Sequence, residues 1–414
     1  MIKRPEGAFR WIQGGVTAPR GFRAQGMHCG LKRFKTKDLA LIVSETPAVA
    51  TGAFTANKLK ASCVLFNQRQ LEKGRAQAII ANSGNANCLN GEAGNRDTRA
   101  MARFTARELG LKPRDVLVAS TGLIGVPLPL KKIRAAVPRL AAALGPEGHR
   151  AAAEAILTTD RRVKEAAVAL GDRSGEIRIG AMAKGAGMIH PSMGVNHTAT
   201  MLCFITTDAT VERGALGASL SQAVDQTFNR ITVDADQSTN DMVLLLANGA
   251  SGGPVIRKGS AGYHRFTRAL EAVCLYLAKF IVWDAEGATK FVEIQVRRAR
   301  TMADARAVAD AVASSKLVKT ALFGSDPNWG RIAASVGYAR AKVEPKKLTI
   351  KLASEPVVRR GERVRGLSRS ELHRIFKRKC ITIQIDLNLG GAGLSIWTCD
   401  LSTRYVRINS AYSS

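Results

Sequence analysis

The sequence predicts an α/β protein in which buried sheets are covered by helices. Short runs of apolar residues alternate along the chain with longer segments whose apolar residues recur every three or four positions, and these two patterns are typical of buried strands and amphipathic helices. Hydrophobic residues make up 46% of the chain but aromatic residues only 5%, so we expect a core of closely packed Ala, Val, Leu and Ile. With 414 residues, the chain is long enough for two or three lobes.

In the first half of the chain, the candidate strands are apolar runs rich in small and branched residues; they are 38–43, 49–53, 76–81 and 115–119. Helical periodicity marks 95–109, 129–144 and 147–157. Gly110 and Gly145 follow the first two of these segments and are expected to end them.

The second half continues the alternation. Its candidate strands are 201–207, 242–246, 291–296, 348–352, 380–387 and 393–399. Its candidate helices are 214–228, 264–281, 303–315 and a short one at 328–337 that follows Asp-Pro. Segment 405–408 closes the chain, and the polar stretch 357–370 is expected to be a mobile surface loop. The pairing of the strands does not follow from these patterns.

The chain is strongly basic, with 62 Lys and Arg against 33 Asp and Glu and a net charge of +29. Such a charge is a feature of nucleic-acid-binding proteins. The basic clusters, such as 377–379, are however not interleaved with the aromatic residues that stack on bases. We therefore do not expect nucleic acid as the main partner. A basic surface that attracts anionic metabolites explains the charge equally well.

The cysteine and histidine patterns argue against a disulfide framework and a metal site. Seven cysteines are scattered without Cys-x-x-Cys spacing, which favours reduced thiols and a cytoplasmic location. The six histidines form no His-x-x-x-His pair, so no metal is expected. No apolar run approaches the ~20 residues of a membrane span, and the basic N-terminus lacks the apolar core of a secretory signal. A short organelle-targeting segment, and hence the mitochondrial matrix of a eukaryote, is the alternative.

The tripeptide Ala199-Thr200-Met201 is the most informative part of the sequence. A threonine hydroxyl can attack the carbonyl of a small preceding residue, so that the peptide becomes an ester that water then cleaves. The product is a threonine whose α-amine, which titrates near ~7.7–8.0, can serve as the base for its own hydroxyl. Several glycines between 180 and 194 allow the strained backbone that this reaction needs. An ordinary strand start, which threonine also favours, is the alternative.

Segment 119–127 is a second candidate, because it follows a strand and precedes a helix. Backbone N–H groups in such a turn can bind an anion. Thr121 and Gly122 are therefore candidates for an oxyanion hole. The alternative is an ordinary strand-to-helix turn with glycine for steric relief. Segment 80–88 carries polar side chains that suit either a pocket wall or a turn network.

Two further clusters contain carboxylates. In 229–241, Asp234 and Asp236 suggest acid–base chemistry or a cation site, although the spacing is not that of a calcium loop. Helix capping by Ser238 or Asn240 is the alternative there. Glu286 stands at the end of the long helix, where it either faces a cationic substrate group or is a solvated helix-end carboxylate.

Taken together and in order, these segments resemble the ornithine acetyltransferase (bifunctional glutamate N-acetyltransferase) family of arginine biosynthesis. The likeness extends from Val16-Thr-Ala-Pro to the last residue. The motifs that carry it are 38–42, 81–87, 120–129, 156–160, the glycine run from Lys184, 238–241, 286–293, 323–331, 397–402 and 405–412.

This resemblance implies a layered α/β sandwich, with sheets stacked between helices, of the self-processing N-terminal-nucleophile kind. Cleavage between Ala199 and Thr200 would give an α chain (1–199) and a β chain (200–414), assembled as an α2β2 heterotetramer. The implied reaction moves an acetyl group from N-acetylornithine to glutamate through an ester on Thr200. No cofactor is implied, although some members of the family accept acetyl-CoA as a donor.

By the same resemblance, Thr121 and Gly122 are similar to the oxyanion pair of the family. The positions that match its substrate-contacting residues are Thr158, Lys184, Thr200, Glu286, Asn409 and Ser414. A lysine near the nucleophile can hold an α-carboxylate or support deprotonation of an amine.

The chain departs from the family pattern in several places. Lys184 and Thr200 are separated by 200 − 184 = 16 positions, more than the resemblance leads us to expect. The extra residues put the efficiency of processing in question more than the fold. Trp283 and Ala285 replace residues similar to Arg and Gly, and Ser414 replaces Thr. The functions left open beside the acetyltransferase are an N-terminal-nucleophile amidohydrolase or aminopeptidase, a paralogue with altered amino-acid specificity, and a non-catalytic basic binding protein.

Overall fold

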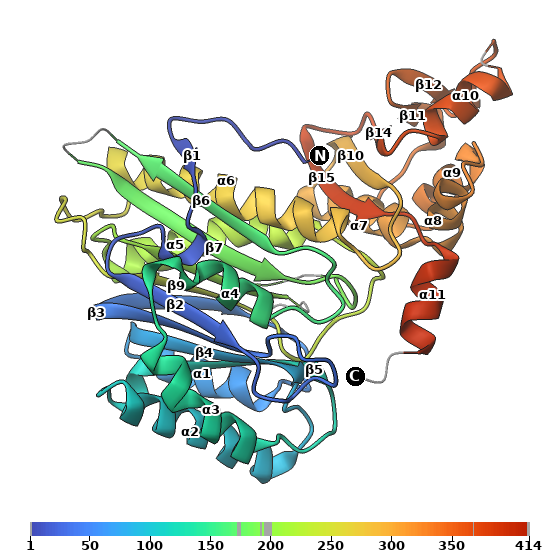
Figure 1. The fold of residues 1–414 in the computed structure, drawn as a ribbon. Coiled ribbons are helices and arrows are strands. Elements are labelled where there is room, and N and C mark those ends of the chain that lie inside the picture. The colour runs from blue at the N-terminus through green and yellow to red at the C-terminus, as the bar shows by residue number, and fades with distance from the viewer. Residues whose placement is uncertain (1, 172–174, 191–192, 194–200, 367, 412–414) are drawn as a thin grey trace. The chain divides into compact units, whose positions relative to one another are not determined.

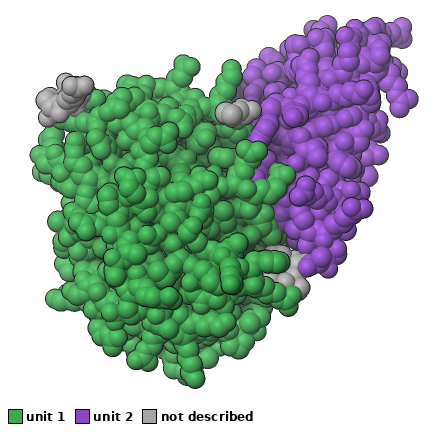
Figure 2. Space-filling model, viewed as in Figure 1, with its two compact units in different colours: residues 1–229, 236–281, 414 green, residues 230–235, 282–413 purple. Residues whose placement is uncertain are grey.

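The computed structural model describes residues 2–171, 175–190, 193, 201–366 and 368–411 (Figure 1). The chain divides into two compact units, which are coloured separately in Figure 2. Unit 1 comprises 1–229, 236–281 and 414, and unit 2 comprises 230–235 and 282–413. The predicted chain division between Ala199 and Thr200 lies outside the described residues and stays a prediction.

Among the described residues, unit 1 contains a nine-stranded sheet in the order β1-β6-β7-β8-β9-β3-β4-β5, with β2 added beside β3. Its strands are β1 (Arg10–Ile12), β2 (Phe22–Met27), β3 (Leu39–Phe54), β4 (Arg75–Asn85), β5 (Val116–Leu123), β6 (Lys164–Leu170), β7 (Ile177–Lys184), β8 (Leu202–Thr207) and β9 (Met242–Ala247).

Strand β3 connects the two halves of this sheet. Its first part pairs with β2 and β4, and its last part, from Val49 to Phe54, pairs with β9. The register against β4 shifts between Val43 and Ala48. Pro47 lies within this break, where its missing N–H removes no ladder hydrogen bond. The single strand β3 therefore belongs to both halves of the sheet and changes direction between them.

The helices of unit 1 pack on both halves of the sheet (Figure 1). They are α1 (Ser62–Leu71), α2 (Gly91–Glu108), α3 (Leu130–Ala142), α4 (His149–Ala155), α5 (Arg213–Gln226) and α6 (Ala261–Trp283), the last of which ends in unit 2. Helices α1 and α2 contact β5, α4 contacts β2, and α5 contacts β3. Short 3₁₀ turns occur at Gly15–Thr17, Pro113–Asp115, Pro146–Gly148, Phe228–Arg230 and, in unit 2, Pro345–Lys347.

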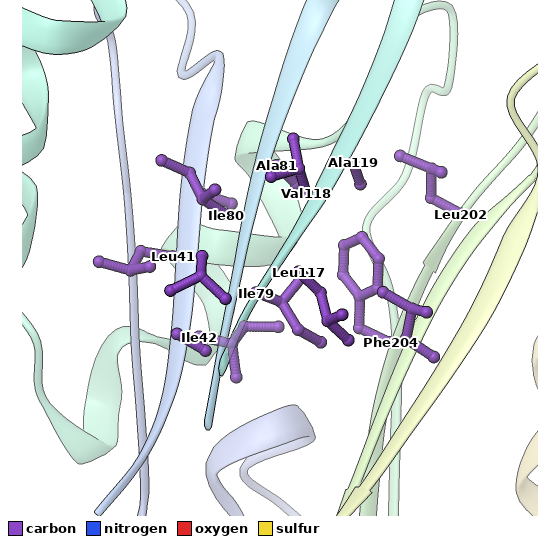
Figure 3. Close-up of a cluster of buried hydrophobic side chains, with 14 of the residues drawn as sticks. Leu41, Ile42, Ile79, Ile80, Ala81, Leu117, Val118, Ala119, Leu202 and Phe204 are labelled. Carbon is purple, nitrogen blue, oxygen red and sulfur yellow. The ribbon is translucent and has the colours of Figure 1, made fainter. Parts of the chain in front are cut away.

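The core of unit 1 lies where the two sheet halves face each other. Leu202 and Phe204 of β8 belong to the same buried cluster as Leu41 of β3, Ile79 of β4 and Leu117 of β5 (Figure 3). Because successive side chains of a strand point to opposite faces, the residues between them, such as Cys203, pack on the other face. The expected α/β sandwich with stacked sheets and covering helices is confirmed, and its core is aliphatic as the composition predicts.

Unit 2 contains, among its described residues, a six-stranded sheet in the order β13-β12-β11-β14-β10-β15. The strands are β10 (Phe291–Ala299), β11 (Thr349–Leu352), β12 (Glu355–Arg359), β13 (Glu362–Arg363), β14 (Cys380–Asp386) and β15 (Ala392–Cys399). The helices are α7 (Met302–Ser314), α8 (Lys316–Phe323), α9 (Trp329–Gly337), α10 (Arg369–Phe376) and α11 (Thr403–Ser410). Val292, Ile294 and Val296 of β10 pack with Val308 and Val312 of α7 in a second aliphatic core.

The expectation of a loop over 357–370 is wrong for most of its length. Strands β12 and β13 form a hairpin in which Arg359 pairs with Glu362. Arg360 and Gly361 both have positive φ angles, of 52° and 82°, which is the backbone that two-residue hairpin turns need. The charged residues of this segment are those of an exposed hairpin, and the composition alone did not distinguish that from a loop.

The segments expected as strands or helices are found, with shifted ends. Segments 38–43 and 49–53 are a single strand, and 405–408 lies in α11. Strands β6 and β7 were not predicted, because the Ala-rich sequence Lys-Glu-Ala-Ala-Val-Ala-Leu and the Arg- and Gly-containing sequence of β7 lack a clear alternation. Helices α1, α8 and α10 were also missed.

Candidate active site

Lys184 brings three predicted site residues together in unit 1. It is the last residue of β7, and its side chain is almost completely buried. Its Nζ donates hydrogen bonds to Thr158 Oγ1 at 2.9 Å and to Thr121 Oγ1 at 3.4 Å. Thr121 comes from β5, and Thr158 follows α4. The ammonium group and two hydroxyl groups therefore converge from three elements far apart in the sequence.

Asp160 supports this group and was not singled out from the sequence. Its buried carboxylate accepts hydrogen bonds from Lys164 Nζ at 2.7 Å and from the Gly185 N–H at 2.8 Å, and it lies 4.0 Å from Lys184 Nζ. Burial raises the pKa of Asp160, but the charges of Lys164 and Lys184 and these hydrogen bonds outweigh burial and hold the pKa well below its ordinary value. The carboxylate stays ionised and stabilises both ammonium groups.

Gly122 follows Thr121 in a position that only glycine fits. Its φ is +134°, and a Cβ there would lie 2.3 Å from the Gly84 carbonyl carbon. Gly84 is its partner in the parallel pairing of β4 with β5. The two glycines let the strand ends approach closely beside Thr121. Both the anion-binding role and the simple turn are compatible with this backbone, so the oxyanion pair stays a prediction.

Segment 80–88 forms an internal network of amide and hydroxyl groups. Asn82 Nδ2 donates to the Asn85 carbonyl at 2.9 Å, and Ser120 Oγ donates to Asn82 Oδ1 at 2.7 Å. Asn240 Nδ2 donates to the Ala86 and Ser120 carbonyls at 2.6 and 2.8 Å. These bonds favour the turn-network interpretation over the pocket wall. The capping alternative for Ser238 and Asn240 is wrong, because the next element is strand β9, not a helix.

Glu286 and Asn409 are brought together within unit 2. Asn409 Nδ2, on α11, donates to Glu286 Oε2 at 2.7 Å. Glu286 is only 7% exposed, so the alternative of a solvated helix-end carboxylate is wrong. Gly287 has φ +68°, and a Cβ there would lie 2.5 Å from the Tyr405 nitrogen. The close contact that this glycine allows holds α11 against the turn that carries Glu286.

The turn after Glu286 is fixed by the residues that precede α11. Asp400 accepts hydrogen bonds from Thr289 N and Lys290 N at 2.8 and 2.9 Å and from Thr289 Oγ1 at 2.5 Å. Ser402 Oγ donates to the Gly287 carbonyl at 2.6 Å. These residues belong to the segment 397–402 noted in the sequence, and the structure gives them a positioning role.

The carboxylate cluster in 229–241 has, among the described residues, no metal-binding geometry. Asp234 accepts a hydrogen bond from Tyr405 Oη at 3.1 Å. Within the described ranges, no group of three or more His, Cys, Asp or Glu side chains converges in a way that could hold a metal ion. The acid–base and cation interpretations of Asp234 and Asp236 therefore gain no support.

Thr200, Ala199 and Ser414 lie outside the described residues. The strand that follows the predicted cleavage point is described, however. Leu202, the first residue of β8, pairs with Lys184, the last residue of β7. The sequence position of the predicted nucleophile is thus two residues before the strand end that adjoins Lys184.

Two surface hollows lie away from these residues. One of about 240 Å³ is lined mainly by α1 and α2, with Arg69 and Arg99 among its residues. The other, of about 520 Å³, is lined by 324–327 and by Arg369, Ser370 and His373. Neither contains a predicted site residue, and the buried Lys184 group is the better candidate because it carries convergent polar chemistry.

Comparison with known proteins decides the family. The ArgJ family model matches residues 23–414. The chain belongs to the ArgJ family. It is 48% identical over 404 residues to the arginine biosynthesis bifunctional protein ArgJ of Symbiobacterium thermophilum, covering 97% of this chain and 99% of that protein. The resemblance inferred from the motifs is confirmed.

Solved ArgJ-family structures match parts of the chain. The crystal structure of arginine biosynthesis bifunctional protein ArgJ from Bacillus halodurans is 38% identical, with a TM-score of 0.49, over 50% of this chain and 98% of that one. Ornithine acetyltransferase of Mycobacterium tuberculosis, solved with ornithine, is 42% identical, with a TM-score of 0.43, over 45% of this chain and 100% of that one. None of the described helices of this ArgJ-family chain is both long and apolar enough to cross a membrane.

Proposed function

We propose that the protein transfers the acetyl group of N-acetylornithine to glutamate through an acetyl ester on Thr200. Membership of the ArgJ family establishes the broader class, an acetyltransferase of arginine biosynthesis. The observation that carries the finer proposal is the Lys184 group next to the start of β8. Leu202, two positions after the proposed nucleophile, pairs with Lys184, and two residues of chain span at most ~7 Å. This supports the proposal that the Lys184 group acts together with Thr200.

The proposed reaction has two halves. In the first, the α-amine of Thr200 takes the hydroxyl proton while Oγ bonds to the acetyl carbonyl carbon. The C–N bond then breaks, and the proton passes to the departing ornithine amine. In the second, the glutamate amine attacks the ester carbonyl, the Thr200 oxygen leaves and regains a proton, and N-acetylglutamate forms. Both tetrahedral intermediates carry an oxyanion, which N–H or O–H donors at Thr121 and Gly122 would stabilise.

The remaining residues would bind the amino-acid parts of the substrates. The buried ammonium of Lys184 suits a carboxylate, and Thr158 Oγ1 lies beside it. The Glu286–Asn409 pair in unit 2 offers a carboxylate and an amide to cationic or polar substrate groups. Ser414 is assigned a substrate contact through the family motif alone. We further propose an α2β2 assembly in the cytoplasm, with acetyl-CoA as an additional acetyl donor and no cofactor.

The decisive experiment combines intact-mass analysis with an acetyl-transfer assay. The purified protein should give two chains, 1–199 and 200–414, and should convert N-acetylornithine and glutamate to ornithine and N-acetylglutamate. Thr200→Ala should give one uncleaved, inactive chain. Release of acetate without glutamate would instead identify a hydrolase, and an uncleaved wild-type chain with full transferase activity would refute the Thr200 mechanism.

A further inference from the structure

The loop between β2 and β3 is organised by a buried carboxylate in unit 1. Asp38, just before β3, accepts backbone hydrogen bonds from Cys29 at 2.6 Å, Gly30 at 3.1 Å, Leu31 at 2.7 Å and Lys32 at 3.2 Å. A carboxylate that accepts several N–H bonds holds the backbone in one conformation. The position of Lys32 is therefore fixed by the fold and is not that of a free surface side chain.

The side chain of Lys32 lies close to Gly84, which pairs with the glycine next to Thr121. A Cβ built on Gly84 would lie 3.3 Å from Lys32 Cγ. Gly84 pairs with Gly122, the residue that follows Thr121. The lysine stem thus lies against Gly84 near the end of β4, next to the strand that carries Thr121.

The ammonium group of Lys32 has unused hydrogen-bonding capacity. Within the part of the chain that the structure describes, its one acceptor is the Lys37 carbonyl, at 2.8 Å, and no carboxylate lies within ion-pair distance. A lysine ammonium has three N–H donors, so two remain for a ligand. Desolvation of a half-buried ammonium that has no counter-ion is costly, and an anion that bound there would offset that cost.

The charges of the neighbouring site act on this ammonium. Burial lowers the pKa of Lys32 to about 8; the charge of Asp38 opposes this, that of Lys184 adds to it, and that of Asp160 opposes it. Lys32 is therefore within electrostatic reach of the Lys184 group. Its pKa would rise again on contact with an anion, because an opposite charge favours the protonated form.

We propose that Lys32 is a second substrate-binding cation, whose ammonium holds a carboxylate of the amino-acid substrate beside the Lys184 group. The inference rests on the proposed transferase function. Glutamate carries two carboxylates and N-acetylornithine one. Two ammonium groups in one site suit the dianionic acceptor.

The test is the kinetics of Lys32→Gln against Lys35→Gln, which removes the same charge from an exposed position of the same loop. Loss of a charged hydrogen bond costs ~1.5–3 kcal/mol, so KM should rise roughly 10- to 100-fold with little change in kcat. A rise for both substrates identifies the α-carboxylate that they share, and a rise for glutamate alone identifies its side-chain carboxylate. Unchanged KM values, or a loss confined to kcat, would overturn the proposal.

Lys32→Arg keeps the positive charge, and it replaces Lys32→Gln as the test variant if the Gln variant fails to fold. In the wild type, KM should rise as the pH increases through about 8, because Lys32 loses its proton; in Lys32→Arg this rise should disappear, since arginine stays protonated. An identical pH dependence in both enzymes would contradict the proposal. Wild-type protein that transfers no acetyl group would refute the proposed function instead, so the two failures are distinguishable.

Discussion

At the scale of single residues, the site in unit 1 depends on one buried carboxylate that stabilises two buried ammonium groups. Asp160 and Lys164 have fully buried side chains, and Lys184 lies beside them. Removing Asp160 alone would leave two buried ammonium groups without this carboxylate in a low-dielectric environment. This dependence explains why a residue with no direct role in the reaction can be as important as the groups that touch substrate.

Asp160→Asn should destabilise the fold by ~3–5 kcal/mol, because it leaves buried ammonium groups without their carboxylate. Urea unfolding of this variant, with the exposed Glu72→Gln as the control, measures the loss. The folded-state pKa of Asp160 lies below its unfolded value. Its ionised form therefore contributes stability that is fully present above pH ~4 and is lost as the pH falls toward the folded-state pKa. An Asn variant with wild-type stability and acid sensitivity would contradict this account.

Gly122→Ala should be poorly tolerated for two separable reasons. The added Cβ would lie 2.3 Å from the Gly84 carbonyl carbon, and φ is +134°. Gly125→Ala is the matched control, since its φ is +78° and nothing lies within 4 Å of its added Cβ. We expect a loss of ~1 kcal/mol for the control, from backbone strain alone, and a loss greater by several kcal/mol for Gly122→Ala. Equal losses in thermal unfolding experiments would show that the close approach of β4 and β5 is unimportant.

At the scale of elements, strand ends position the site. Lys184 ends β7, Thr121 lies near the end of β5, and Leu202 begins β8. In unit 2, the turn after α6 is held by the residues between β15 and α11. In unit 1 strand ends carry functional groups, and in unit 2 a turn held by buried polar residues carries Glu286. Support of this kind is how precise sites are generally built.

Asp400→Ala should loosen the turn that carries Glu286. The change removes three acceptor contacts, to Thr289 N, Thr289 Oγ1 and Lys290 N, and leaves the buried Lys290 N–H unsatisfied at ~1–3 kcal/mol. Hydrogen exchange of the amides in 286–290 should accelerate at least tenfold, and the transferase KM should rise. Ser410→Ala, an exposed change on α11, should alter neither. Unchanged exchange in Asp400→Ala would rule out the positioning role.

At the scale of the whole molecule, the charge of +29 is the dominant property. Like charges on a compact protein repel one another and lower its stability. Raising NaCl from 10 to 150 mM shortens the Debye length from ~30 to ~8 Å, so the melting temperature should rise with salt. A melting temperature that is flat or falls would show that the positive charges are already compensated locally.

The fold class and most elements could be predicted from the sequence. Long apolar or periodic segments such as α6 and β9 show their helical or strand pattern whatever element they pack against. The family motifs gave Thr121, Thr158 and Lys184 as site residues, and in the structure their side chains meet; their roles in the reaction stay predictions. Asp160 and Lys32 could not be found in this way. Their importance depends on which strands lie side by side, and strand pairing is set by tertiary packing that no local pattern records.

The place of β8 in the sheet affects how the protein would dissociate and refold after processing. This strand lies between β7 and β9. Strands β8 and β9 would belong to one product and β7 and β3 to the other, so scission just before β8 would leave the β7–β8 and β3–β9 pairings shared between the two products. Neither fragment could depart without opening the middle of a sheet, and once unfolded together they would have to find each other again by diffusion. After cleavage, the protein could no longer refold as a single chain. Refolding of the two chains would be a second-order process, and dilution would slow it.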